Sequence, residues 1–268
     1  MKRHFSGVAK GVFAVTLALQ SIYPVYDASA KAASAQDVHE IADMCMYSQR
    51  ILKDYALVGM GVTYHDPAKD LITSAKTINK YIIDLESHHL KKSLDDEIRE
   101  LEGLWKEIEP QLLEKPVKKR MTFLHKKVEQ FSHRCEVVAD HVATDTGIEG
   151  EHYVVLVAQL GMESQRLAAL YMMKAWGIAD DNYYEEVEEV LKEYEDIYHE
   201  LLNADEKLVS PEIKEKLKST EKHFLVFEFM ASSKSGRFVP TMAEKSASKI
   251  FDEIREILKL EEELVEHE

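Results

Sequence analysis

The chain contains few of the residues that interrupt helices. Only 10 glycines and 6 prolines occur in 268 residues, whereas hydrophobic residues make up 45% and charged residues 31%. This composition is typical of a helix-rich globular protein and excludes a disordered one. The length allows one large domain or two of ordinary size.

Positive charge is also scarce. Lysine and arginine total 34 against 49 aspartates and glutamates, so the formal net charge is -15. A chain without a basic excess has no electrostatic footprint for nucleic acid, and this class of partner is therefore excluded. The acidic residues are spread along the expected helices, which indicates solvated helix faces.

Motifs for catalysis and cofactor binding are missing. The chain has no Gly-x-Ser-x-Gly, no glycine-rich phosphate loop, no His-Glu-x-x-His and no Cys-x-x-Cys-His. Two acid-x-x-His spacings, Glu86 to His89 and Asp196 to His199, do not occupy equivalent positions of the repeat described below. We therefore expect no enzyme, no metal site and no cofactor. Some aromatic residues lie on apolar stripes and are expected in the core: Trp105, Trp176, Phe224 and Phe227.

Long apolar runs are absent beyond the N-terminus. There, Lys2, Arg3 and Lys10 flank the apolar run 11–19, and Ala28-Ser29-Ala30 resembles a signal-peptidase site. We predict a signal peptide over residues 1–30, cleaved after Ala30, and export to the periplasm or beyond. The alternative is an uncleaved anchor, but the run is shorter than the roughly 20 residues that span a bilayer.

An internal repeat is the most informative feature of the sequence. Residues 41–62 (IADMCMYSQRILKDYALVGMGV) return 116 positions later as residues 157–178 (VAQLGMESQRLAALYMMKAWGI). Seven of the 22 positions are identical, namely Ala42/Ala158, Met46/Met162, Ser48/Ser164, Gln49/Gln165, Arg50/Arg166, Tyr55/Tyr171 and Gly61/Gly177. In each copy a seam of small and apolar residues and a second, displaced row predict a helix covered from two sides.

Apolar residues at helical spacing predict four helices in each half of the chain. The expected ranges are 36–63, 67–89, 92–113 and 117–143, then 151–178, 182–203, a helix starting at Pro211, and 241–266. Asp66 before Pro67 and Ser210 before Pro211 are predicted N-caps. We predict an all-α fold of two tandem antiparallel four-helix bundles, residues 36–146 and 150–266, divided within 144–150.

The repeated stretch resembles a known family. Met46-Tyr-Ser-Gln-Arg50, followed by Lys53-Asp-Tyr55, is similar to the signature of the PilJ-like domain, the N-terminal domain of type IV pili methyl-accepting chemotaxis transducers. This domain is related to the sensor domains of nitrate/nitrite sensor kinases. Met162-Glu-Ser-Gln-Arg166 is a weaker match to the same signature. The resemblance covers residues 36–63 best and 67–89 more loosely.

The resemblance implies an extracytoplasmic sensory bundle that holds a small anion between two copies of its first helix. Guanidinium groups suit this role, because they present planar, permanently charged donors to an oxyanion. The implied ligand-binding residues are Arg50, Arg166, Ser48, Ser164, Gln49 and Gln165, with the two arginines facing each other. The sequence departs from the family where a companion arginine is replaced by Cys45 and Gly161. A purely structural role for Ser-Gln-Arg is the alternative.

The two cysteines, Cys45 and Cys135, fall at matching heights of antiparallel helices. An exported location would permit a disulfide between them, and two buried thiols are the alternative.

The leading functional hypothesis is a sensory, ligand-binding bundle that has no output domain and acts through a partner protein. Its ligand would be a small anion or small organic molecule, bound where helices 36–63 and 151–178 meet. Its partner would be an envelope sensor or a pilus-associated protein. The alternative is a structural or scaffold protein of the cell envelope without a small-molecule ligand.

Overall fold

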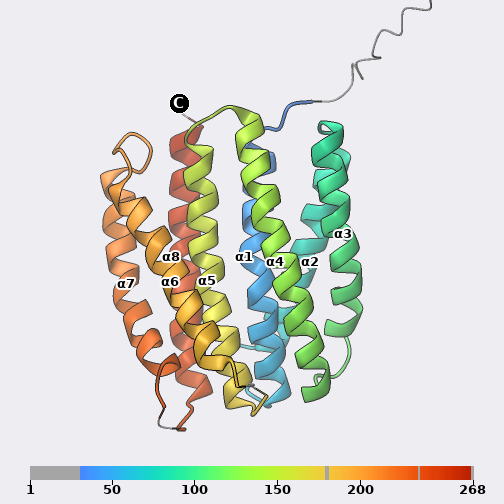
Figure 1. Ribbon diagram of the computed structural model, residues 1–268, viewed down its shortest axis with the longest axis vertical. Helices are drawn as coiled ribbons and strands as arrows, with labels where there is room; N and C mark the ends of the chain where they lie inside the picture. The colour runs from blue at the N-terminus through green and yellow to red at the C-terminus, as the bar shows by residue number, and fades with distance from the viewer. Residues whose placement is uncertain (1–30, 179–180, 235, 267–268) are drawn as a thin grey trace, which may run out of the picture.

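The protein is described by a computed structural model that covers residues 31–178, 181–234 and 236–266. In these ranges it is all-α, with eight helices (Figure 1). Their bounds are α1 Ala35–Gly59, α2 Pro67–Ser87, α3 Lys92–Leu112, α4 Lys118–Thr146, α5 Glu151–Ala175, α6 Tyr183–Asn203, α7 Pro211–Ala231 and α8 Pro240–Val265. The sequence predicted all eight helices, and every end that it specified agrees to within a few residues.

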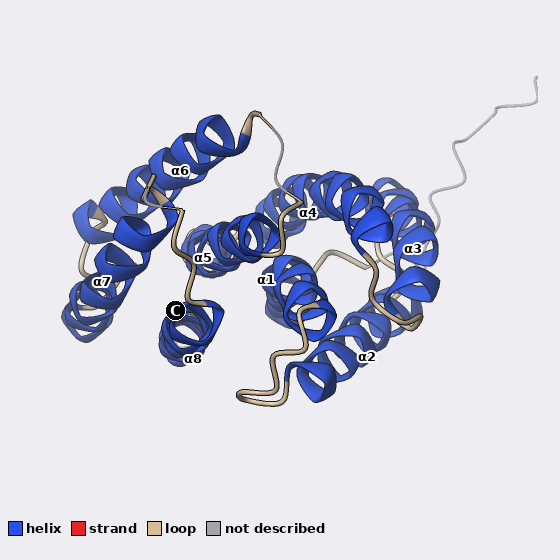
Figure 2. Ribbon diagram, turned by 90° about the horizontal axis from the view of Figure 1, so that it is seen from below, coloured by secondary structure: helices blue, strands red, loops and turns tan. Residues whose placement is uncertain are grey.

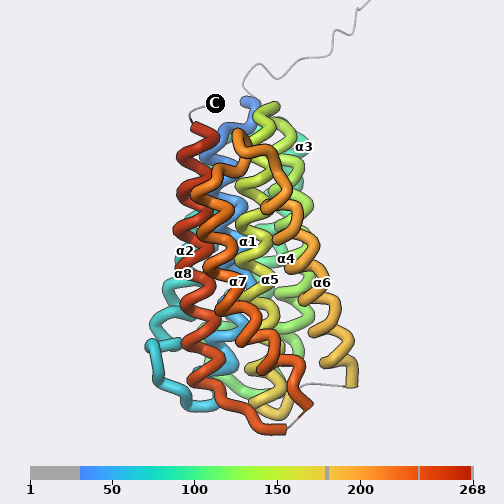
Figure 3. Tube along the Cα trace, turned by 90° about the vertical axis from the view of Figure 1, so that its left-hand side faces the viewer, coloured from blue at the N-terminus to red at the C-terminus, as the bar shows by residue number. Residues whose placement is uncertain are grey.

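Two helices occupy the centre of the molecule. Figure 2 shows α1 and α5 side by side, with α2, α3 and α4 around α1 and with α6, α7 and α8 around α5. The α1–α5 interface is the most extensive helix–helix contact in the described chain. The helices run along the long axis of the molecule, and α1 begins at the end where α8 finishes (Figure 3).

The central position of α1 and α5 explains their composition. α1 packs against α2, α4, α5 and α8, so most of its residues are buried, and α5 is buried in the same way. The outer helices bury one stripe each, as expected for amphipathic helices at a surface. Because one continuous apolar core runs through all eight helices, the division into two modules stays a prediction.

Local signals place several helix ends. The side chain of Asp66 accepts a hydrogen bond from the Lys69 amide, and Ser210 accepts one from the Ile213 amide, so both predicted N-caps are confirmed. α4 ends at Gly147, which has a positive φ of 73°. The helix therefore extends further than the predicted end at residue 143, and the break between the halves is shortened to 147–150.

The predicted signal peptide lies outside the described residues. Within the described ranges no helix is long and apolar enough to cross a membrane.

Candidate functional site

The repeated tyrosine has the same structural role in both copies. The Tyr55 hydroxyl accepts a hydrogen bond from the Val117 amide at 3.2 Å, and the Tyr171 hydroxyl accepts one from the Val239 amide at 2.8 Å. Val117 and Val239 are the N-cap residues of α4 and α8. The tyrosine of each central helix thus accepts a hydrogen bond from a backbone N–H group at the start of the fourth helix of the same half. The first N–H groups of a helix have no partner within that helix.

The repeated glycine ends each central helix. Gly61 and Gly177 adopt φ values of 75° and 73°, which side chains disfavour. The following amides, of Val62 and Ile178, donate to the carbonyls of Leu57 and Met173. Both ends therefore form a Schellman motif.

The repeated serine and glutamine are buried and hydrogen-bonded. The hydroxyl of Ser48 donates to the Cys45 carbonyl at 2.6 Å, and that of Ser164 donates to the Gly161 carbonyl at 2.7 Å. Gln49 donates through Nε2 to Glu129 at 2.8 Å.

In the second copy, the Gln165 Nε2 atom donates to the Ala247 carbonyl at 3.0 Å. Four of the six predicted ligand-binding residues, the two serines and the two glutamines, are thus 0% exposed. Ser48 and Gln49 connect α1 to α4, and Gln165 connects α5 to α8, whereas the Ser164 hydroxyl donates within α5.

The copies differ where Cys45 corresponds to Gly161. Cys45 and Cys135 form a disulfide that joins α1 to α4, with an S–S distance of 2.12 Å and Cα atoms 5.6 Å apart. At Gly161, an added Cβ would come within 2.6 Å of the Met46 sulfur and 3.0 Å of Ile254. The missing side chain therefore lets α1 pack closely against α5.

Arg50 lies between α2 and α8, in a site that we call closed because aromatic rings cover it; its side chain is 14% exposed and that of Arg166 is 16% exposed. Its Nη2 atom is 2.6 Å from the Asp70 carboxylate on α2, and its Nε atom is 3.6 Å from Asp54. Its guanidinium carbon lies 4.3 Å from the ring centre of Phe251 on α8, a cation–π contact. The Phe251 ring packs edge-on against Tyr47. Aromatic side chains therefore cover the Arg50 site.

A buried ion cluster adjoins Arg50. Lys53 Nζ lies 2.8 Å from Glu244 on α8 and 3.2 Å from Asp54, and these three side chains are at most 1% exposed. Burial raises the pKa of Asp54 to about 6, although Lys53 and Arg50 act in the opposite direction. Such a cluster is stable only while each charge keeps its partner. In the second copy Lys53 and Asp54 correspond to Ala169 and Leu170.

Arg166 lies between α4 and α6, among carboxylates only. It contacts Glu129 of α4 and Glu193 of α6, each at 2.9 Å, and Glu163 of its own helix at 3.5 Å. Glu163 occupies the repeat position of Tyr47. A carboxylate thus replaces one of the aromatic rings that cover the Arg50 site.

The space around Arg166 is open. A groove of about 360 Å³, which we call the Arg166 groove, lies between α4, α5 and α6 with one lining residue from α1. Its lining residues are Gln49, Glu129, Gln130, Ser132, His133, Glu136, Met162, Glu163, Arg166, Glu189 and Glu193. The groove therefore contains five carboxyl groups and one guanidinium.

Burial is the main cause of the raised proton affinities in the groove, and neighbouring carboxylates add to it. Burial raises the pKa of Glu136 to about 7, and Glu193 raises it further whereas Arg166 lowers it. Burial also raises the pKa of Glu163 well above its usual range, with Arg166 opposing and neighbouring carboxylates reinforcing the shift. Both shifts favour the neutral, protonated carboxyl, so the negative charge of the groove lies mainly on its other three carboxyl groups, which still outnumber Arg166.

The prediction that the two arginines face each other is wrong. Arg50 contacts residues of α2 and α8, whereas Arg166 contacts residues of α4 and α6. Figure 2 shows α8 and α4 on opposite sides of the α1–α5 pair. The face of a helix that an arginine uses depends on its neighbours, and the spacing of a motif along one helix does not specify them.

Sequence reasoning missed the charged partners. Lys53 lies on the displaced row of the first repeat helix, and that row should have indicated burial from a second side. The glutamates of the Arg166 groove follow no pattern in the sequence, because they come from three helices.

Metal coordination is not indicated: in the described residues, no group of three or more histidine, cysteine, aspartate or glutamate side chains is placed to hold a metal ion.

Comparison with protein-family models, with curated proteins and with solved structures gave no match to this chain.

Proposed function

We propose that this chain is a non-enzymatic, ligand-binding bundle that takes a small organic cation into the Arg166 groove. The observation that carries the proposal is the composition of the groove: five carboxyl groups surround one guanidinium in an open space of about 360 Å³. A cation would relieve the repulsion among these carboxylates, whereas an anion would increase it.

A second observation supports a polar ligand. Gln49 lines the groove and is 0% exposed, and its Oε1 atom has no hydrogen-bond partner in the described structure. A buried acceptor without a donor is costly, and an ammonium group would supply donors. A linear diamine combines two such groups with a small volume.

The proposal retains the expected cellular role. The signal-like N-terminus and the similarity of the repeat to the PilJ-like signature support an exported sensory protein. We propose that a bound ligand is reported through a partner protein of the envelope.

Calorimetric titration with putrescine tests the proposal, with sodium nitrate as the opposing probe. We expect putrescine to bind and nitrate to give no heat of binding. Glu193→Gln removes a carboxylate of the groove, and we expect it to weaken putrescine binding by roughly 5–10-fold, a change typical of one lost charge pair.

Asp70→Asn is the matched control, because it makes the same change beside Arg50, in the closed site, and should leave putrescine affinity unchanged. Nitrate binding that depends on Arg166, or putrescine binding that is insensitive to Glu193→Gln, would overturn the proposal.

The scaffold alternative also has an observation in its favour. The repeated serine, tyrosine and glycine have equivalent structural roles in both copies, so the repeat can be explained without a ligand. A chain that binds neither probe would favour this alternative.

A further inference from the structure

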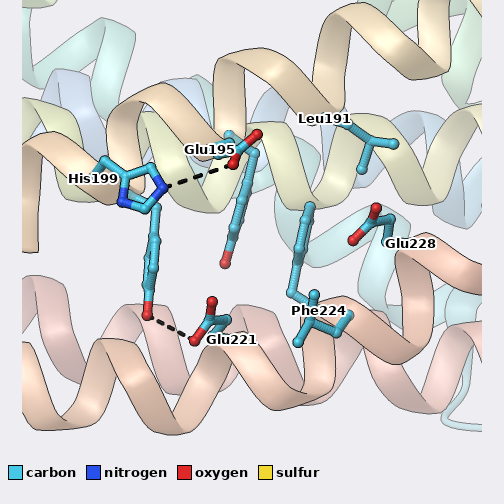
Figure 4. A pocket seen from close by; sticks show the side chains of 9 residues that line it. Leu191, Glu195, His199, Glu221, Phe224 and Glu228 are labelled. Atoms are coloured by element: carbon cyan, nitrogen blue, oxygen red, sulfur yellow. Dashed lines mark hydrogen bonds and ion pairs between the residues drawn. The ribbon is translucent and has the colours of Figure 1, made fainter.

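A second pocket lies between α6 and α7, away from the residues that line the Arg166 groove. Figure 4 shows Leu191, Glu195 and His199 opposite Glu221, Phe224 and Glu228. The pocket has a volume of about 280 Å³, and its lining residues are Leu191, Tyr194, Glu195, Tyr198, His199, Glu221, Phe224, Leu225 and Glu228. We call it the α6–α7 slot.

Three aromatic rings stand nearly parallel in the slot. The rings of Tyr194 and Phe224 are in full contact, with centroids 3.4 Å apart and planes at 3°. The rings of Tyr194 and Tyr198 are also nearly parallel, at 12°, but their centroids are 6.4 Å apart. Carbon atoms in contact lie about 3.5–4.0 Å apart. A flat group between the two tyrosine rings needs two such distances, and the centroid separation of 6.4 Å is slightly less, so the rings must move apart a little to admit it.

Carboxyl groups outnumber basic groups around these rings, and the one basic lining residue, His199, lies 3.7 Å from Glu195. Three carboxyl groups line the slot, from Glu195, Glu221 and Glu228, and no lysine or arginine of the described chain is among the lining residues. Glu221 accepts a hydrogen bond from the Tyr198 hydroxyl at 3.0 Å, which holds a carboxylate beside the ring. The faces of aromatic rings and carboxylates both attract cations.

One polar group of the slot is unsatisfied. Tyr194 is 3% exposed, and its hydroxyl oxygen makes no hydrogen bond within the part of the chain that the structure describes. Buried tyrosine hydroxyls usually find a partner. A ligand with an N–H or C=O group near the rings would provide one.

The equivalent helices of the first half are packed differently. Ile78 and Ile82 occupy the repeat positions of Tyr194 and Tyr198, and Trp105 lies at the same distance from the start of α3 as Phe224 from the start of α7. These three side chains are at most 3% exposed. The Trp105 ring nitrogen donates to Asn79 at 2.6 Å, so its polar atom has a partner. Aliphatic packing thus replaces the parallel rings.

From these features we infer that the α6–α7 slot binds a flat organic cation, such as an aromatic amidinium, heteroaromatic cation or guanidinium compound, between Tyr194 and Tyr198. The parallel rings select a flat group, the carboxylates select positive charge, and the Tyr194 hydroxyl gains a hydrogen-bond partner. This inference does not depend on the Arg166 groove.

Three probes separate flatness from charge. Calorimetric titration of the full chain would compare benzamidine, which is flat and cationic, with neutral benzamide and with cyclohexanecarboxamidine, which is cationic but has a puckered ring. We expect benzamidine to bind roughly ten-fold more tightly than either, because only it combines stacking with the cation–π attraction. Equal affinity for benzamidine and benzamide, or no binding of benzamidine, would overturn the inference.

Two variants locate the binding. Tyr198→Ile introduces the residue found at Ile82 and removes one ring, and we expect benzamidine affinity to fall by roughly ten-fold or more. Glu221→Gln keeps the shape of a partly exposed side chain and is expected to weaken benzamidine by roughly 5–10-fold. Circular dichroism would verify that both variants fold.

Glu212→Gln, on the exposed start of α7, is the matched control and should have no effect on benzamidine binding. Glu193→Gln, which tests the Arg166 groove, should likewise leave benzamidine unchanged, so the two proposals can fail separately. If benzamidine affinity is unchanged in both Tyr198→Ile and Glu221→Gln, benzamidine binds elsewhere, and the α6–α7 slot is rejected as its binding site.

Discussion

The two halves of this molecule share a central helix but differ in what surrounds it. In the first half, residues 35–146, the repeated arginine is covered by aromatic rings, a buried ion cluster adjoins it, and a disulfide joins α1 to α4. In the second half, residues 151–265, the same arginine lines an open acidic groove, and α6 and α7 enclose a slot.

This comparison shows how a duplicated helix can serve two purposes. The residues that are identical in both copies maintain the fold, since they cap helices and connect them. The residues that differ determine what covers the arginine, as at Tyr47 and Glu163. Both sites use residues of both halves, since Phe251 of α8 covers Arg50 and Glu129 of α4 lines the Arg166 groove. We therefore expect the Arg50 site to contribute mainly stability and the Arg166 groove binding.

The largest expected effect concerns the buried ion cluster of the first half. Lys53→Ala introduces the residue found at Ala169, leaves Glu244 buried without its cation and leaves Asp54 with Arg50 alone, so we expect a loss of about 3–5 kcal/mol of unfolding free energy. Urea denaturation would measure it. The triple variant Lys53→Ala, Asp54→Leu and Glu244→Leu should recover most of the loss. A single variant as stable as the wild type would contradict the assignment of the cluster.

The disulfide should have the next largest effect. Replacing both Cys45 and Cys135 by serine frees a loop with a sequence separation of 90 and should cost about 2–4 kcal/mol. Thermal unfolding of the wild type with and without reductant provides the comparison. We expect reductant to lower the melting temperature of the wild type and to leave that of the double-serine variant unchanged. If reductant changes the melting temperatures of both proteins equally, the disulfide does not make the expected contribution to stability.

The acidic groove should make stability depend on pH. Burial raises the folded-state pKa of Glu136 to about 7, above its ordinary value, so the folded protein binds more protons than the unfolded one between about pH 4.5 and 7. Stability contributed by this group is therefore lost as the pH rises through that window, by about 1–3 kcal/mol. Asp54, with a pKa raised to about 6, adds a smaller loss of the same sign.

Urea denaturation at a series of pH values would reveal this dependence. Glu136→Gln should flatten the profile between pH 5 and 7, whereas Glu212→Gln, at an exposed position, should not. A wild-type profile that rises with pH throughout this range would contradict the expected protonation of the groove.

The smallest expected effects test what the halves share. Tyr55→Phe and Tyr171→Phe each remove the acceptor of one N-cap amide, and each should cost about 1 kcal/mol. The Tyr55 hydroxyl also accepts a hydrogen bond from Arg120 at 3.4 Å, so we expect the loss in Tyr55→Phe to equal or slightly exceed that in Tyr171→Phe. A clearly larger loss in Tyr171→Phe, measured from the denaturation midpoints, would contradict this account of the repeat.

Much of the fold could be predicted from the sequence, for physical reasons that are local. Apolar periodicity and caps such as Asp66-Pro67 depend only on residues that are near in sequence, so they could be recognised there. The helices of the structure confirm the helix ranges and the all-α class that these signals predicted. The matching heights of Cys45 and Cys135 likewise indicated that a disulfide was possible. The repeat identified the two helices that lie at the centre.

The sites could not be predicted to the same extent. The direction of Arg50 and Arg166 depends on Phe251 and on Glu129, which are distant in sequence and occur in no motif. Similarly, Phe224 was expected in the core and is buried, but its stacking on Tyr194 depends on how α7 packs against α6. Long-range packing of this kind leaves no periodic signal.

We propose that a cation binds beside the repeated arginine only at Arg166, where the arginine lines a groove, and not at Arg50. Hydrogen–deuterium exchange with and without saturating putrescine tests it directly. We predict slower exchange in peptides covering 129–136 of α4 and 189–193 of α6, with no change in peptides of α2 around Asp70. Equal protection around Asp70, or no protection at either site, would contradict the claim.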